Sequence, residues 1–265
     1  MKVLAIGDPH GNIEKIGKIP IDNIDIILLT GDLGKADLAR KRLFENVERE
    51  KQGLEELEED KSYVKEAYME IHSSTIDILK YLSRHAPVYT IQGNVGIPTA
   101  SHVRKYRDKY GISLPATRDK INSMKNVYLV KNRLKVVNGL RIGFLEFFTD
   151  TNWVSEFKPS DYRKIMRKAK KQTDKARRIL SRFDNGLDIF LFHQPPYGYL
   201  DKVGNPAPKH WRGKHAGSKV ILEYIKKHQP RYAFCGHIHE GEGFRKIGKT
   251  EVYNLGVCGY KVIEF

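Results

Sequence analysis

The sequence has little cysteine and no apolar stretch of the length needed to cross a bilayer. Its 265 residues include two cysteines, Cys235 and Cys258, which are too few for a disulfide framework. Both stand in apolar, strand-like contexts, so we predict that they are small core residues. No apolar run approaches the roughly 20 residues of a membrane-spanning helix. The first residues enter a strand-like run without a charged leader, so we expect a cytoplasmic protein with no membrane partner.

Acidic residues are fewer than basic ones. The chain carries 47 Lys and Arg against 32 Asp and Glu, a formal net charge of +15. Such an excess favours a polyanionic partner such as nucleic acid. Abundant Lys and Glu with scarce glutamine are also typical of the heavily charged surface of a thermophile protein. The total charge leaves both interpretations open, and the distribution along the chain has to decide.

Short apolar runs of strand length recur along the chain. We predict strands over residues 2–6, 24–30, 87–91, 127–130, 134–137, 140–145, 187–192, 231–235, 251–255 and 260–265. Asn138-Gly139 separates two of these runs and is the strongest short hairpin signal, so the sheet gains antiparallel members there. Further helices are predicted from Pro98 to Tyr110, ended by Gly111, and from an N-cap at Ser218 to His228.

Two long segments lack strand character, and we interpret them as helical insertions in a single domain of residues 1–265. The first covers about 36–85, and the second covers about 149–184. In the first, residues 64–82 have the spacing of an amphipathic helix. The acidic residues 45–60 before it predict an additional helix, broken at Gly53 or near Asp60. Together these two helices would form a solvated hairpin.

The second insertion contains a very basic helix, opened by Pro159-Ser160-Asp161 and closed by Asn185-Gly186. Ten Lys and Arg residues lie between Arg163 and Arg182, against Asp174 alone. Clustered cations are what phosphate contacts with nucleic acid require. Apolar residues at helical spacing nevertheless indicate an ordinary helix with one packed face. The acidic segment is an alternative partner for this helix, within the chain or in a homo-oligomer.

Polar side chains of metal-ligand type follow five of the predicted strands. They are Asp8, His10, Asp32, Asn94, His193, His237 and His239. Ligands gather beyond the carboxyl ends of the strands in open α/β sheets. Carboxylate and amide oxygens mixed with imidazoles suit Mn, Fe, Zn, Ni or Co. Seven ligands exceed the need of one ion and suit two ions that share a carboxylate. We therefore predict two divalent metal ions, with Mn favoured.

At these positions the chain resembles the calcineurin-like metallophosphoesterase family. The matching blocks, in family order, are Asp8-Pro9-His10, Gly31-Asp32-Leu33-Gly34, Gly93-Asn94, His193 and Gly236-His237-Ile238-His239. The resemblance implies an α/β fold, a four-layer α/β/β/α sandwich with two facing mixed β-sheets. It also implies a ligand set: Asp8, His10 and His239 for metal 1, Asn94, His193 and His237 for metal 2, and Asp32 as the bridge.

The resemblance implies hydrolysis of a phosphate ester. Two cations lower the pKa of a bridging water, so that a hydroxide is available near neutral pH, and they stabilise an in-line displacement. We predict a metal-dependent phosphoesterase acting on phosphodiester or phosphomonoester bonds. A nuclease acting on DNA or RNA is the alternative that the charge favours. A non-catalytic metal-binding scaffold is a further alternative, although retention of all seven ligand residues argues against it.

The third block departs from the family pattern. It is usually Gly-Asn-His, and here Val95 follows Asn94. In the family that histidine contacts the scissile phosphate and protonates the leaving group, and valine can do neither. His215, which precedes the N-terminus of a predicted helix, and His102 are candidate replacements. We place Asn94 and His215 among the catalytic residues and His102 on a helix surface.

The missing histidine also leaves open a substrate with a good leaving group, or a loss of turnover with retained metal binding. General acid catalysis contributes about 10²–10⁴-fold, so a poor leaving group suffers most. We therefore favour diesters or activated substrates. The loop of residues 197–214 follows His193 and contains aromatic and cationic side chains. It either contacts a nucleotide or is a plain surface loop.

Overall fold

The computed structural model describes residues 1–183 and 186–265, so Asn185, the expected end of the basic helix, lies outside the described residues. The helices are α1 (Ile13–Ile16), α2 (Asp37–Lys51), α3 (Lys61–Leu82), α4 (Ala100–Tyr110), α5 (Thr117–Asn122), α6 (Thr151–Phe157), α7 (Tyr162–Leu180) and α8 (Lys219–His228), with short 3₁₀ turns η1 (Lys209–Trp211) and η2 (His239–Gly241). The strands are β1 (Lys2–Ile6), β2 (Ile26–Leu29), β3 (Val88–Thr90), β4 (Val127–Leu129), β5 (Arg133–Val137), β6 (Leu140–Leu145), β7 (Ile189–Phe192), β8 (Tyr232–Cys235), β9 (Gly243–Ile247), β10 (Thr250–Asn254) and β11 (Tyr260–Glu264).

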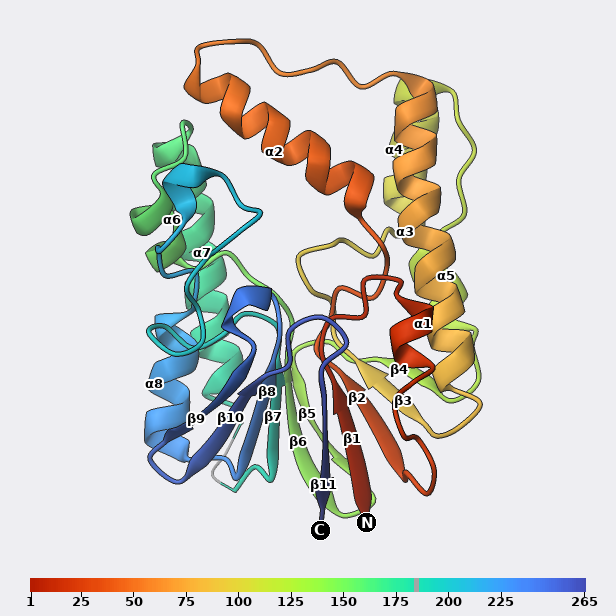
Figure 1. The fold of residues 1–265 in the computed structure, drawn as a ribbon, viewed down its shortest axis with the longest axis vertical. Coiled ribbons are helices and arrows are strands. Elements are labelled where there is room, and N and C mark those ends of the chain that lie inside the picture. The colour runs from red at the N-terminus through yellow and green to blue at the C-terminus, as the bar shows by residue number, and fades with distance from the viewer. Residues whose placement is uncertain (184–185) are drawn as a thin grey trace.

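The strands form two mixed sheets (Figure 1). Sheet 1 has the order β11-β1-β2-β3-β4, in which β11 is antiparallel to β1 and the other neighbours are parallel. Sheet 2 has the order β5-β6-β7-β8-β10-β9, with antiparallel pairs at both edges. The parallel centres of both sheets direct their carboxyl ends to the same side of the molecule, where the ligand-bearing loops lie.

Three apolar clusters hold four layers together. The cluster between the sheets includes Val3 and Ile26 of sheet 1 and Phe144 and Leu191 of sheet 2, all fully buried. A second cluster packs α1, α3 and α5 on the outer face of sheet 1. A third packs α7 and α8 on the outer face of sheet 2. The predicted α/β/β/α sandwich is therefore confirmed.

Local sequence signals placed several elements correctly. Asn138 and Gly139 adopt positive φ angles of 48° and 86° and join β5 to β6 as a tight hairpin. Gly111 ends α4 in the left-handed conformation. The Ser218 hydroxyl oxygen accepts a hydrogen bond from the Ile221 N–H and caps α8. Both cysteines are free and buried, as predicted.

The first insertion differs from the predicted hairpin. A helix precedes Gly53, but it begins at Asp37, and residues 53–60 form no helix, so the acidic run lies in an extended connection. The helix α2 does not pack along α3. It leans across the top of the molecule towards α6 and η1 (Figure 1). None of its residues is buried, because it rests on neighbours at a few points and not along a face.

The basic helix α7 covers sheet 2 on its outer side. Its buried residues are Ala169, Thr173, Ala176 and Leu180, which confirms the packed face. On α7, Arg177 forms an ion pair with Glu223 of α8, with 3.1 Å between Nη2 and Oε2. The acidic connection is occupied elsewhere, since Arg42 and Arg49 of α2 donate to the Glu58 and Glu55 carbonyls. Across residues 1–183 and 186–265, no helix is long and apolar enough to cross a membrane.

Sequence analysis missed β9 and the short helices α1, α5 and α6. These helices have four to seven residues, too few to show a helical period. The strand β9 is an edge strand whose centre is exposed, so it lacks an apolar run. It pairs with β10 across a tight turn at Gly248.

Candidate metal site

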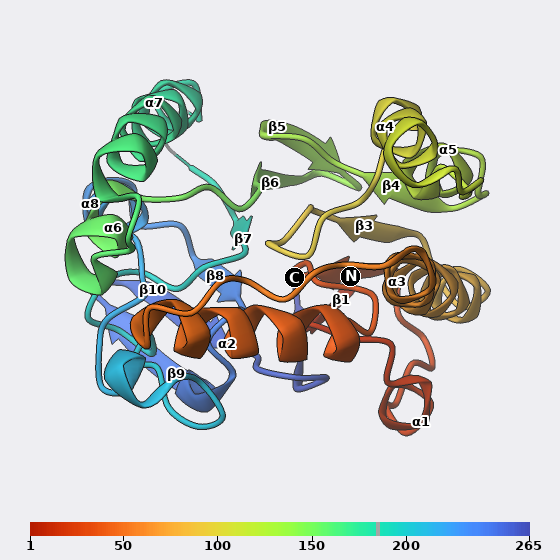
Figure 2. The same ribbon diagram turned by 90° about the horizontal axis from the view of Figure 1, so that it is seen from above.

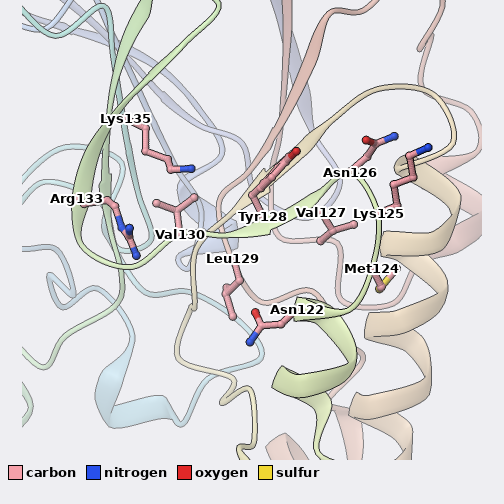
Figure 3. A pocket seen from close by; sticks show the side chains of 10 residues that line it. All are labelled: Asn122, Met124, Lys125, Asn126, Val127, Tyr128, Leu129, Val130, Arg133 and Lys135. Atoms are coloured by element: carbon pink, nitrogen blue, oxygen red, sulfur yellow. The ribbon is translucent and has the colours of Figure 1, made fainter.

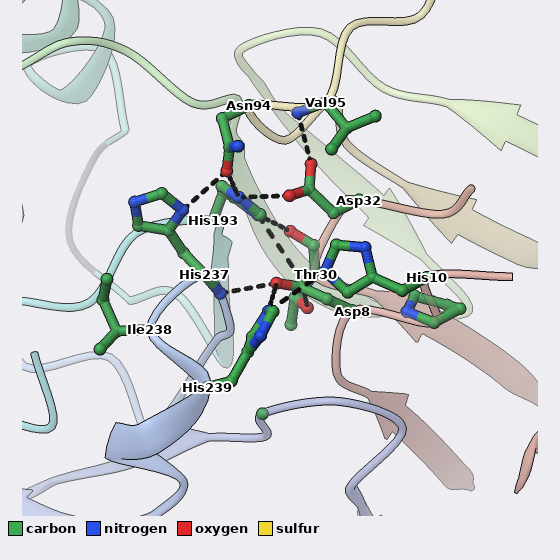
Figure 4. Close-up of polar contacts among 12 residues, drawn as sticks. Asp8, His10, Thr30, Asp32, Asn94, Val95, His193, His237, Ile238 and His239 are labelled. Atoms are coloured by element: carbon green, nitrogen blue, oxygen red, sulfur yellow. Dashed lines mark hydrogen bonds and ion pairs between the residues drawn. The ribbon is translucent and has the colours of Figure 1, made fainter. Parts of the chain in front are cut away.

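All seven predicted ligand residues meet at the carboxyl ends of five strands (Figure 4). The loop after β1 carries Asp8 and His10, and those after β2 and β3 carry Asp32 and Asn94. Sheet 2 contributes His193 after β7, and His237 and His239 after β8. Both sheets thus supply side chains to one place, as the alternation of strands and polar turns predicts.

The first group of ligand atoms, called here the His10 group, consists of Asp8, His10 and His239. The Nε2 atoms of His10 and His239 lie 3.1 Å apart, and His239 Nε2 lies 3.6 Å from Asp8 Oδ2. Ligand atoms of the three residues all lie within 4.8 Å of one another. Two imidazole nitrogens and a carboxylate oxygen that face one point fit a divalent cation.

The second group, called here the Asn94 group, consists of Asp32, Asn94, His193 and His237. Asn94 Oδ1 lies 2.8 Å from His193 Nε2 and 2.7 Å from His237 Nδ1. His193 Nε2 also lies 3.5 Å from Asp32 Oδ2. Asp8, Asp32 and His193 form a second set of ligand atoms within 4.8 Å of one another. The donor set fits a second divalent cation next to the first.

Hydrogen bonds from the surrounding backbone orient these ligands. Asp8 accepts from the Thr30 hydroxyl at 2.6 Å and from the His237 N–H at 2.6 Å. Asp32 accepts from the Val95 N–H at 2.8 Å. His193 Nδ1 donates to the Thr30 carbonyl at 3.0 Å, which leaves Nε2 free to bind a metal. Thr30 therefore serves both groups, and sequence analysis did not single it out.

The buried charges of the site shift its pKa values in opposite directions. Burial raises the pKa of the Asp8 carboxyl, but the neighbouring His193 and His239 imidazoles outweigh burial and hold it well below its usual value. Burial lowers the pKa of His237 to about 3, and it also lowers that of His10. Burial opposes the charge of His193 too, but the Asp32 and Asp8 carboxylates raise its pKa to about 9. A cation that binds must displace this proton.

Three ligand residues adopt the left-handed backbone conformation. The φ angles are 43° for His10, 37° for Asp32 and 66° for His237. Such conformations are rare for residues with a side chain and cluster at functional sites, where the surrounding structure holds them. At His237 the turn breaks the alternation of an extended chain, so that His237 and His239 reach the site from one side. The turn expected after Gly236 is confirmed.

Two glycines of the matched blocks permit close packing around the carboxylates. A Cβ atom on Gly93 would lie 2.2 Å from Asp32 Oδ1, and one on Gly236 would lie 2.4 Å from Asp8 Oδ1. Neither space can hold even a methyl group. The glycines before Asn94 and His237 are thus required by the packing of the ligands, a role that their place in the sequence motifs did not explain.

Phe147 is a site residue that sequence analysis missed. Its ring lies 5.8 Å from the His193 ring and 5.3 Å from the His237 ring, centroid to centroid. Its N–H donates to the Gln92 carbonyl at 3.0 Å, which links the segment after β6 to the segment before Asn94. A phenylalanine in an apolar context carries no signal of such a role.

His215 forms a pair with a buried carboxylate. Its Nδ1 lies 2.7 Å from Asp201 Oδ1, and the Asp201 side chain is 1% exposed whereas that of His215 is 28% exposed. The loop that carries both residues packs against the ligand segment, since the Asn254 amide donates to the carbonyls of Leu200 and Ile238. The Asp201 carboxylate therefore fixes the orientation of the His215 ring. The Asp201 partner has no signature in the sequence.

The other sequence candidates have structural roles. His102 Nδ1 lies 2.8 Å from the Thr99 hydroxyl and closes the cap of α4, so the expected helix-surface position is confirmed. In the loop of residues 197–214, Trp211 packs edge-on against Phe157 and Phe44, with centroids 5.5 Å and 6.3 Å away. This ring is part of an apolar cluster and not a free surface for stacking a base.

A separate pocket lies between β4 and β5 (Figure 3). Its lining residues are Asn122, Met124, Lys125, Asn126, Val127, Tyr128, Leu129, Val130, Arg133 and Lys135. None of these is a predicted ligand, and the pocket follows the open edges of the two sheets. We assign it no part in the metal site.

Comparison with known proteins agrees with this site. The human metallophosphoesterase domain-containing protein 1 is 39% identical over 74 residues, which are 28% of this chain and 21% of that protein. An uncharacterized protein of Methanocaldococcus jannaschii is 32% identical over 90 residues, 33% of this chain and 39% of that protein. The matched segments thus span between 21% and 39% of these relatives.

A solved crystal structure shares the fold over the whole chain. It aligns with a TM-score of 0.57 at 18% identity, covering 100% of this chain and 98% of its own. The family model described as calcineurin-like phosphoesterase matches residues 1–241, which include all seven ligand residues. The chain therefore belongs to the calcineurin-like phosphoesterase family.

Proposed function

We propose that this protein is a dinuclear metal-dependent phosphodiesterase, with phosphomonoesters as the second substrate class. The observation that carries the proposal is the contact between the two ligand groups, in which Asp8 belongs to both sets of closely spaced ligand atoms. Asp8, His10 and His239 would hold metal 1. Asn94, His193 and His237 would hold metal 2, and Asp32 would be a ligand shared by both. We propose Mn as the metal, because the ligands mix hard oxygens with imidazoles.

When bound, the two ions activate a water and offset the charge of the phosphoryl oxygens. The protein's part is to hold the ligands before the substrate arrives. The Val95 N–H and the Thr30 hydroxyl fix the two carboxylates, Asp32 and Asp8, at 2.8 Å and 2.6 Å. Preorganised groups of this kind need no rearrangement during the reaction.

The proposal assigns the proton for the leaving group to His215. Asp201 holds Nδ1 at 2.7 Å, so the other ring nitrogen, Nε2, faces outward from the pair. A buried carboxylate that orients an imidazole is the usual arrangement for a general acid or base. His215 would thereby replace the histidine that this chain lacks at Val95. Asn94 is the second catalytic residue of the proposal, as a ligand of metal 2.

The proposal treats residues 1–265 as one domain with helical insertions at about 36–85 and 149–184. Both sheets contribute ligands, and β11 returns to pair with β1 next to the first ligand loop, which supports a single unit. It also places the protein in the cytoplasm. Two free, buried thiols suit a reducing compartment.

A substrate panel tests the function. The protein is assayed on aryl and alkyl monoesters and diesters, nucleotides and phosphoanhydrides, each with Mn, Ni, Zn and Mg. We expect the highest rate on an aryl diester with Mn. Asp8→Asn and His237→Ala should abolish this activity, and His85→Ala, remote from the matched blocks, serves as the control. Full activity in either purified ligand variant would contradict the dinuclear assignment.

Leaving-group dependence tests His215. An aryl leaving group departs without a proton, whereas an alkoxide needs one. His215→Gln should therefore lower kcat on an alkyl ester by about 10²-fold or more and leave an aryl ester nearly unchanged. His102→Gln should change neither. Equal losses on both esters would assign His215 a structural role.

A nuclease is the second candidate function, because the net charge is +15 and α7 carries clustered cations. Against it, α7 covers the outer face of sheet 2 (Figure 2). The test is salt-dependent binding and Mn-dependent cutting of single-stranded and duplex DNA. Cutting that is faster than hydrolysis of any small diester would make the nuclease the better description.

A further inference from the structure

The helix α2 crosses from the half of the molecule that contains α3 to the half that contains α6, on the side where the ligand-bearing loops lie (Figures 1 and 2). At its start, the Leu38 N–H donates to Glu70 of α3 at 3.2 Å, and the Tyr63 hydroxyl donates to the Leu38 carbonyl at 3.1 Å. These bonds fix the start of the helix on the side of sheet 1. Because the start lies five positions after the bridging Asp32, the helix leaves directly from the site.

The far part of α2 rests on the side of sheet 2. The Phe44 ring meets the Trp211 ring edge-on at 6.3 Å, and Glu48 Oε1 lies 3.8 Å from His210 Nδ1. Trp211 packs in turn against Trp153 and Phe157 of α6. The helix therefore bridges the two halves, and we call it the strap.

One face of the strap carries Arg40, Phe44 and Glu48, which are spaced four residues apart and so lie in line along the helix. Phe44 and Glu48 contact η1. Arg40, the member nearest the start, lies beside His10: its Nη2 is 3.5 Å from His10 Nδ1, the ring nitrogen opposite the Nε2 that meets His239, and its side chain is 34% exposed. The strap thus places one guanidinium beside the His10 group.

Arg40 does not serve as a supporting partner for His10. A metal-bound histidine usually donates its second ring N–H to a carboxylate, carbonyl or water. A guanidinium has only donors and cannot accept that hydrogen. Its acidic neighbour on the strap, Asp37, is 60% exposed and 4.0 Å away, too far and too solvated for a strong pair. Arg40 therefore offers donors beside the site without a close carboxylate.

We propose that Arg40 binds a phosphate oxygen of the substrate. The inference rests on the proposed function and adds a substrate-binding residue to it. A guanidinium binds phosphate through two parallel N–H bonds. It would supply part of the phosphate contact that the valine at position 95 cannot make.

Inorganic phosphate is the probe for Arg40. Calorimetric titration of the Mn-loaded protein measures phosphate affinity without turnover, and competition with an aryl diester gives the inhibition constant. Arg40→Ala should weaken phosphate binding about 10- to 100-fold, as expected for a charged hydrogen bond, and raise KM more than it lowers kcat. Arg40→Lys should give a smaller loss, because lysine keeps the charge without the two parallel bonds.

Lys41→Ala is the matched control, since it removes the same charge from an exposed neighbouring position and should change phosphate affinity less than about twofold. Metal content and circular dichroism are measured for every variant. The inference is overturned if Arg40→Ala binds phosphate as the wild type does with its metal content intact, or if the wild type binds no phosphate. The first result leaves the proposed function standing. A wild-type protein that binds phosphate through Arg40 but hydrolyses no ester would overturn the proposed function alone.

Discussion

His193 of the Asn94 group is held more firmly than His10 and His239 of the His10 group. In the Asn94 group, His193 is fully buried and donates to the Thr30 carbonyl, and Asp32 accepts a backbone N–H. In the His10 group, the His239 side chain is 29% exposed, and the second nitrogen of His10 faces a guanidinium. Preorganised ligands bind metal more tightly because less order is lost on binding. We therefore expect an ion at the Asn94 group, with His193 as a ligand, to be bound more tightly than one at the His10 group.

The largest effect is expected from His193→Ala. His193 lies next to both carboxylates of the site, 3.7 Å from Asp8 Oδ1 and 3.5 Å from Asp32 Oδ2. Its removal should lower phosphodiesterase activity by at least about 10³-fold, on the scale of losing a central charge-stabilising group. Elemental analysis should find both ions depleted, whereas His239→Ala should lose one ion only. If each variant loses one ion, the expected difference in metal affinity between the Asn94 group and the His10 group is wrong.

Thr30→Val separates the two hydrogen bonds that Thr30 makes with the ligand residues Asp8 and His193. The substitution removes the hydroxyl that donates to Asp8 but keeps the carbonyl that accepts from His193. We expect the affinity of the His10 group to fall about 10- to 100-fold, the usual effect of losing an outer-shell partner. The affinity of the Asn94 group should change less. Two-site metal titration measures both constants, and an equal fall in both would contradict the comparison.

The metal-free protein should lose stability as the pH rises from about 6.5 to about 9. The Asp32 and Asp8 carboxylates raise the pKa of His193 to about 9 in the folded chain, above its usual value of 6.5. A raised pKa contributes stability that is complete below the lower value and lost as the pH passes the higher one. Melting temperatures in EDTA test this, with His193→Gln as the reference. A wild-type protein whose melting temperature stays parallel to that of the variant would disprove it.

The smallest effect is expected from Phe44→Ala, which removes the ring that holds the strap against Trp211. The strap lies beside the His10 group but contributes no ligand, so metal content should stay at the wild-type level. KM for a small diester should rise about threefold, on the scale of one lost aromatic pair, with kcat unchanged. Steady-state kinetics give both constants. A fall in metal content would show that the strap supports the ligands directly.

The ligands could be predicted from the sequence because each belongs to a local pattern. An apolar run that ends in Gly31-Asp32 or Gly236-His237 places its polar residue at the end of a strand, whatever the rest of the chain does. Parallel pairing then brings these ends together. Local patterns did not predict the two facing sheets, because strand order depends on contacts between distant segments. That prediction came from the family resemblance.

The residues around the ligands could not be predicted, because their roles depend on where whole elements lie. Arg40 reaches His10 because Glu70 and Tyr63 of α3 hold the first turn of α2 in place. Asp201 becomes the partner of His215 when its loop folds back on itself. Neither relation leaves a period or a motif in the sequence. The acidic residues 45–60 predicted an additional helix, with a break at Gly53 or near Asp60, but not the direction in which that helix runs.

The two histidines of the His10 group have a consequence for how the protein folds. His10 and His239, whose Nε2 atoms lie 3.1 Å apart, are separated by 229 positions in the chain. Contacts between such distant residues form slowly, because a large loop of chain must close first. A metal ion can bind both histidines only after these distant segments have come together, so we expect it to bind late in folding.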